Sequence, residues 1–126
     1  MTILIIDDDA GIRELVSLFL THKGYAAVGA RNGAEALAYL DQHRPLPDLI
    51  LLDLMMPVMD GATFRQVQMD TPALAGIPVV VMSAAENIEA QAPTLSATAY
   101  LPKPIDFDVL VQYVEQHSGQ SRQHGG

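Results

Sequence analysis

Short runs of consecutive apolar residues recur along the chain, separated by segments with helical periodicity. The runs at residues 3–6, 49–52 and 79–82 contain only apolar residues, and residues 25–30 and 100–101 form two weaker runs. Strands that are apolar on both faces are typical of a parallel sheet covered by helices on both sides. Because crossovers between parallel strands are right-handed, the pattern predicts an α/β, doubly wound sandwich.

The helical pattern is weakest between the last two runs. Asn87 can cap a helix that begins at Ile88, but Pro93 disfavours a helical conformation at the residue before it. We therefore expect a short or irregular helix here. Its stability would depend on packing of Ile88 and Leu95 against the sheet.

Length and composition indicate a single domain. The chain has 126 residues, enough for one substantial core. We assign residues 1–117 to this domain and expect a flexible polar tail at residues 118–126. The chain lacks Cys, which excludes disulfides, thiolate metal sites and cysteine nucleophiles and is consistent with a reducing compartment. No apolar run approaches the roughly 18 residues needed to cross a bilayer, and no basic leader precedes the first run, so we expect a cytoplasmic protein.

The charge of the chain limits its partners. The net charge is −8, which disfavours direct binding to nucleic acid or to an anionic membrane. Aromatic residues make up only 6% and there is no Trp, so little material is available for stacking on nucleobases or sugars.

Polar residues end four of the apolar runs, and parallel strands bring such ends to one edge of the sheet. They are Asp7 and Asp8, Asp53, Ser83 and Lys103. Taken singly, each has an ordinary explanation as a turn, helix-capping or solvated residue. Three carboxylates at one edge repel each other, however, and a cation between them relieves that repulsion. An oxygen-only set of ligands suits Mg²⁺, and a carboxylate beside Mg²⁺ can act as a nucleophile toward phosphorus.

The order and spacing of these segments resemble bacterial response-regulator receiver domains, the CheY-like family of two-component systems. The segments are LIIDDD at residues 4–9, LLDLMMPVMDG at residues 51–61, VMSA at residues 81–84 and YLPKP at residues 100–104. The resemblance extends from residue 2 to about residue 117. It implies a (βα)5 flavodoxin-like sandwich whose five-stranded parallel sheet has the order 2-1-3-4-5. It also implies a phosphorylation-dependent signalling switch.

The resemblance further implies the residues of a phosphoacceptor and metal site. Asp53 would be the phosphoacceptor, receiving its phosphoryl group from a sensor histidine kinase or a histidine phosphotransfer protein. Mg²⁺ would be held by Asp7, Asp8, Asp53 and the backbone carbonyl of Met55. The domain would assist its own phosphorylation and dephosphorylation without being a conventional enzyme.

Switch residues follow from the same resemblance. Ser83, Ala84 and Lys103 would bind the phosphoryl group, and the rotamer of Tyr100 would report activation. Pro104 would have a structural role, with a cis bond after Lys103 that directs the lysine toward the strand ends. The output would be altered affinity for an unidentified downstream target, at a face built from the last two helices and the strand between them. We expect a monomer or a phosphorylation-dependent dimer.

The chain departs from the family pattern before its last strand. The stretch between Ser83 and Tyr100 is shorter than is usual, and Ser96 stands where a glycine is common. The departure concerns the surface that would carry the output and leaves the phosphorylation residues intact.

Two other functions use similar residues. A degenerate receiver would act as a constitutive binding module, but such domains usually lack the acceptor, the acidic pair or the lysine. A haloacid-dehalogenase-type phosphatase also has an Asp nucleophile after a strand. It needs a second Asp two residues later, where this chain has Met55.

Overall fold

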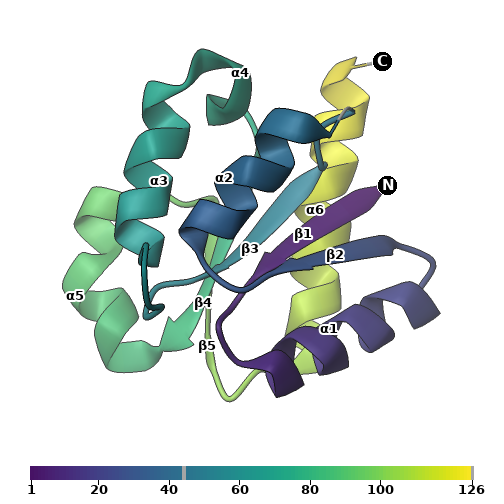
Figure 1. Ribbon diagram of the computed structural model, residues 1–126. Coiled ribbons are helices and arrows are strands. Elements are labelled where there is room, and N and C mark those ends of the chain that lie inside the picture. Colours follow the sequence, from purple (N-terminus) through teal and green to yellow (C-terminus); the bar gives the residue numbers. More distant parts are fainter. Residues whose placement is uncertain (44, 126) are drawn as a thin grey trace.

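Five parallel strands form one sheet in the order β2-β1-β3-β4-β5 (Figure 1). The computed structural model describes the backbone of residues 1–43 and 45–125 and the side chains of residues 1–43 and 45–117. The strands are β1 (Thr2–Ile6), β2 (Ala26–Ala30), β3 (Leu49–Asp53), β4 (Val79–Ala84) and β5 (Ala99–Lys103). The predicted doubly wound sandwich and its strand order are confirmed.

Helices cover both faces of the sheet. One face packs against α1 (Ala10–His22) and α6 (Phe107–Gly125). The other packs against α2 (Gly33–Gln42), α3 (Gly61–Asp70), the short α4 (Pro72–Ala75) and α5 (Ala85–Leu95). The short α4, which follows α3 almost directly, was not expected from the sequence.

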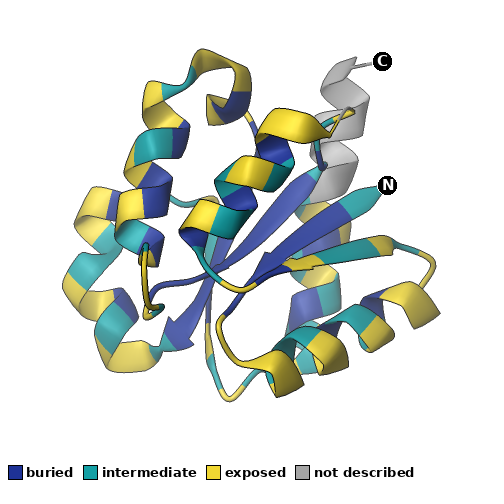
Figure 2. Cartoon of the chain, viewed as in Figure 1, coloured by how far each residue is buried: buried dark blue, intermediate teal, exposed yellow. Residues whose placement is uncertain are grey.

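Alternate residues of each central strand enter two separate cores. In β1, Ile3 and Ile5 pack toward α1 and α6, whereas Leu4 and Ile6 pack toward α2, α3 and α5. All four are fully buried, and burying each such side chain contributes roughly 1.5–3 kcal/mol. This two-sided burial explains the uninterrupted apolar runs, and Figure 2 shows the buried strands between helices whose outer faces are exposed.

Among the described residues, four helices begin with a side-chain cap just after a strand or its loop, and at α6 the cap is Asp106, which accepts from Asp108 N and Val109 N. Asp9 accepts hydrogen bonds from Gly11 N and Ile12 N at the start of α1. Asn32 accepts from Glu35 N in α2, and Asp60 caps α3 in the same manner. These caps satisfy amide groups that have no partner within the helix.

Helix α5 corrects the prediction of a short helix between Ser83 and Tyr100. It spans Ala85–Leu95, so it begins before Asn87 and continues through Pro93. The expectation was wrong because Pro93 lies in the last turn, where it removes a single backbone hydrogen bond, and because tertiary contacts hold that turn in place. The expected packing of Ile88 and Leu95 is confirmed, since both are buried in the core on this face.

The tail expected from the sequence falls in the C-terminal part of α6. The flexible tail expected at residues 118–126 falls on residues whose side chains are outside those described, so it stays a prediction. Among the described residues, no helix combines the length and the apolar character needed to cross a membrane.

Candidate functional site

Three carboxylates meet where β1 and β3 end. Ile6 pairs with Leu52 in the parallel register, so Asp7 and Asp53 follow neighbouring positions on adjacent strands. Ligand atoms of Asp7, Asp8 and Asp53 all lie within 4.8 Å of one another. Asp7 and Asp53 are buried and Asp8 is exposed, so the cluster is open to solvent on the side of Asp8.

Lys103 joins this cluster from the end of β5. Its Nζ donates a hydrogen bond to Asp7 Oδ2 at 2.8 Å and lies 3.5 Å from Asp53 Oδ2. The lysine therefore reaches across the end of β4, which separates β5 from β3 in the sheet. The Lys103-Pro104 bond is cis, which confirms the expectation from the sequence.

The charges of these four residues are unbalanced. Three carboxylates and one ammonium leave a formal charge of −2. Burial, and next the charge of Asp7, raise the pKa of Asp53 above its usual range. Burial alone would lower the pKa of Lys103, but the hydrogen bond to Asp7 and the charges of both carboxylates outweigh it and raise that pKa. The folded site thus favours the cationic lysine and disfavours an ionised Asp53.

Ser83 and Ala84 lie at the same edge of the sheet. Asp53, the last residue of β3, pairs with Met82, so the buried Ser83 lies one residue past the position opposite Asp53. Ala84 pairs with Lys103 and immediately precedes α5. Both residues are therefore connected to the start of α5 with no intervening loop.

Tyr100 contacts α5 in this structure. Its hydroxyl donates to the carbonyl of Ala92 at 3.2 Å, and its half-buried ring packs against the core on the α5 face. Of the residues expected to act together, the three acids thus lie within 4.8 Å of one another and Lys103 binds Asp7, whereas Tyr100 is bonded to α5.

The loop after β3 is shaped by a glycine. Gly61 N donates to Leu54 O at 2.9 Å, closing the loop that contains Met55. A Cβ at Gly61 would lie 2.4 Å from the backbone oxygen of Asp53 and 2.7 Å from Leu54 Cα. Only glycine permits this close approach. Val58, at the exposed tip of the loop, has a φ of 67°.

Two residues that support Asp7 escaped the sequence analysis. Arg13 Nη1 donates to Asp7 O at 2.7 Å, and Asp9 N donates to Asp7 Oδ1 at 2.9 Å. Asp9 was detectable as a helix cap, and it has that role here. Nothing in the local sequence distinguishes Arg13 from any other arginine on a helix.

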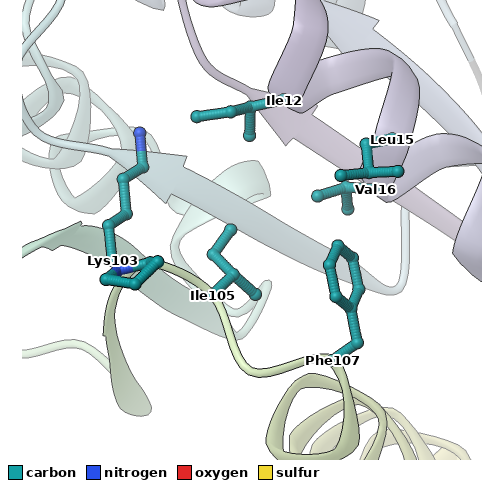
Figure 3. Close-up of a pocket in the computed structure, with 7 residues that line it drawn as sticks. Ile12, Leu15, Val16, Lys103, Ile105 and Phe107 are labelled. Atoms are coloured by element: carbon teal, nitrogen blue, oxygen red, sulfur yellow. The ribbon is translucent and has the colours of Figure 1, made fainter.

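An apolar hollow of about 250 Å³ adjoins the site between α1 and the β5–α6 loop (Figure 3). Its lining is formed by Ile12, Leu15, Val16, Lys103, Pro104, Ile105 and Phe107. Lys103 is the charged residue in this lining.

This fold, with acids at the ends of β1 and β3 and a lysine at the end of β5, defines a class of signalling domain. The sequence matches the response regulator receiver domain family over residues 3–115. The chain therefore belongs to this family, and the family resemblance is confirmed.

Relatives and solved structures agree with this assignment. The transcriptional regulatory protein GlrR of Escherichia coli (strain K12) is 38% identical over 122 residues, covering 94% of this chain and 26% of the relative. The DNA-binding transcriptional regulator NtrC of the same strain is 36% identical over 115 residues, covering 89% and 24%. The signal receiver domain of a signal transduction histidine kinase from Syntrophus aciditrophicus superposes with a TM-score of 0.87 at 30% identity, covering 94% of this chain and 90% of that one.

The chain spans about a quarter of the length of these two regulators. The similarity therefore concerns their receiver portion.

Proposed function

We propose that Asp53 accepts a phosphoryl group from a sensor histidine kinase or a histidine phosphotransfer protein, with Mg²⁺ bound at the acid cluster. Membership of the receiver family implies phosphorylation-dependent signalling. The observation that carries the specific assignment is the position of Asp53, which is 4% exposed and lies between Asp7, Asp8 and Lys103.

The donor set fits Mg²⁺. The three carboxylates offer only oxygen ligands. Together with Lys103 they carry a formal charge of −2, which a divalent cation would neutralise. Burial, and next the charge of Asp7, raise the pKa of Asp53, and a bound cation would offset both by stabilising the ionised carboxylate. Asp7, Asp8, Asp53 and the Met55 carbonyl would hold the ion, which would supply charge neutralisation to the transferred phosphoryl group.

The chain's own residues account for the transfer. A carboxylate oxygen of Asp53 forms a bond to phosphorus as the nitrogen–phosphorus bond of the donor breaks, and the electron pair leaves with the imidazole. The product is an acyl phosphate. Lys103 neutralises phosphoryl oxygens, and the hydroxyl of Ser83 and the amide of Ala84 donate hydrogen bonds to them. Because Asp7 already orients Lys103, the lysine needs little rearrangement to bind the phosphoryl group.

Phosphorylation would then act on α5. The new negative charge draws Lys103 and Ser83 inward, and Ala84 moves with them. For Tyr100 to rotate toward Ser83, its hydrogen bond to Ala92 must break. The output surface comprises α5, β5 and α6, where affinity for a downstream target changes.

The competing hypothesis of a constitutive binding module is less favoured, because the acceptor, the acidic pair and the lysine are all present and lie close together. We infer that the domain promotes its own phosphorylation from small donors and its own hydrolysis, since it positions the reacting groups itself. Its cytoplasmic location and its oligomeric state stay predictions.

Intact mass measured with acetyl phosphate and Mg²⁺ tests the assignment. Wild type should gain one phosphate and Asp53→Asn none. Asp60→Asn is the matched control, because it removes an exposed acid of the same loop while Asn retains the helix cap. Full labelling of the Asp53 variant, or loss of labelling in the control alone, would show that the acceptor is elsewhere.

The protein donor has its own candidate surface. Leu15 and Leu18 are 55% and 69% exposed on α1, beside the hollow next to Lys103. A donor that reaches Asp53 over this edge would bury them. We therefore expect Leu18→Lys to slow transfer from a purified histidine kinase that phosphorylates wild type, while labelling by acetyl phosphate is unchanged. Met69→Lys, on α3, removes another exposed apolar side chain and serves as the control.

A further inference from the structure

Arg65 is a buried cation with no part in the phosphoryl site. It lies on α3 with 8% of its surface exposed, and burial lowers its pKa. The ion pairs found among the described residues do not include it. An arginine stays charged in proteins, so its charge must be met by other groups.

Those groups are backbone carbonyls where α5 ends. Arg65 Nε donates to Leu95 O at 2.8 Å, and Nη2 donates to Ser96 O at 2.7 Å. Ser96 has a φ of 50° and terminates the helix in the left-handed region. The C-terminal end of a helix carries partial negative charge and carbonyls without helical partners, so the guanidinium satisfies both needs.

The guanidinium is itself held in place. Its Nη1 donates to Gln68 Oε1 at 2.8 Å, and the fully buried Gln68 donates from Nε2 to Leu74 O and Ile77 O, both at 3.0 Å. The contact with α5 is therefore anchored to α3 and to the segment around α4. The guanidinium is thus held by a partner on α3 as well as by the carbonyls at the end of α5.

The two ends of α5 are held very differently. At the N-terminal end, Ala84 provides no side-chain cap, and it directly follows Ser83 in the phosphoryl site. At the C-terminal end, Arg65 binds two carbonyls and Tyr100 binds that of Ala92. The bonds from Arg65 use donors and acceptors other than those of the bond from Tyr100.

We propose that Arg65 is a positioning residue that fixes the C-terminal end of α5. When the site is phosphorylated, α5 moves about this fixed end, and the displacement is confined mainly to its first turns. This inference rests on the proposed function, because phosphorylation at Asp53 supplies the displacement.

Amide hydrogen exchange with and without beryllofluoride and Mg²⁺ tests it. Beryllofluoride mimics a phosphoryl group on a carboxylate. In wild type, exchange at residues 85–90 should change on adding it, whereas exchange at residues 94–97 should stay within about 2-fold. In Arg65→Met, which keeps the bulk but has no donors, exchange at residues 94–97 should rise about 10- to 100-fold. The response to beryllofluoride should then extend over the whole helix.

Controls separate this inference from a general loss of stability. Gln66→Met alters the neighbouring, exposed residue of α3, whose side chain bonds only within the helix, and should behave like wild type. If Arg65→Met does not fold, Arg65→Lys replaces it, because lysine keeps the charge but lacks the planar guanidinium that binds two carbonyls at once. Exchange at residues 94–97 should then rise as in Arg65→Met, by a smaller factor. A merely structural role would speed exchange without altering which amides respond to beryllofluoride.

Acetyl phosphate labelling of each variant distinguishes the possible failures. If wild type is not labelled at all, the proposed function is wrong. If wild type is labelled but residues 94–97 respond to beryllofluoride as strongly as residues 85–90, the proposed role of Arg65 is overturned. An unchanged response pattern in folded Arg65 variants would overturn it equally.

Discussion

Substituting Gly61 tests how tightly the loop after β3 is coupled to the acceptor. In Gly61→Ala the new methyl carbon would lie 2.4 Å from the Asp53 carbonyl oxygen, whereas ordinary contacts begin at 3.4 Å. Either the backbone of Gly61 or that of Asp53 and Leu54 must therefore shift by about 1 Å. The nearest atoms belong to the backbone, which has no rotamer through which to escape.

That displacement should be visible in both stability and phosphorylation. Overpacking of this kind lowers the free energy of unfolding by about 1–3 kcal/mol. A misplacement of about 1 Å at a reacting group slows chemistry by about 100-fold. We expect both effects in Gly61→Ala, measured as urea unfolding and as the rate of labelling by acetyl phosphate.

Gly76→Ala is the matched control. A Cβ at Gly76 meets nothing within 4 Å, and its backbone has a φ of −81°, which alanine adopts readily. This variant should keep the wild-type labelling rate and have equal or slightly higher stability. If Gly61→Ala labels within 3-fold of wild type, the loop tolerates the shift and the argument from close packing fails.

Three further predictions concern the site and its loop. Asp8→Ala should weaken Mg²⁺ binding by at least about 10-fold in a direct titration, because too few oxygen ligands remain. The control Asp9→Asn keeps the helix cap and should bind Mg²⁺ with nearly the affinity of wild type. In EDTA at pH 7, Asp53→Asn should be more stable than wild type, because the raised pKa of Asp53 means that its ionised form destabilises the metal-free fold. The difference in free energy of unfolding between the variant and wild type should shrink as the pH falls from the raised pKa of folded Asp53 to about 4, its pKa in the unfolded chain. A difference that stays constant over this range would contradict the reasoning. Val58→Gly should raise the free energy of unfolding by about 1 kcal/mol, because Val58 is 86% exposed and glycine adopts its positive φ without strain. A lower free energy of unfolding would show that the valine side chain contributes more stability than its backbone strain costs.

Sequence alone predicted the features that depend on local pattern. Continuous apolar runs identified the central strands, because a strand in a parallel sheet needs an apolar residue at every position when helices cover both faces. Since all the strands run the same way, the residues that follow them had to meet at one edge. Asp7, Asp8, Asp53 and Lys103 could therefore be grouped from their positions in the chain, and the structure places them close together.

Only the tertiary structure decided how α5 ends. Local propensity at Pro93 predicted that the helix stops early, but it continues to Leu95. Arg65 is 30 residues away in the chain from Leu95, whose carbonyl it binds. Local patterns report burial and backbone preference over a few residues. They do not indicate which distant donor will bind a carbonyl at the end of a helix, so the contact of Arg65 with α5 follows from tertiary packing alone.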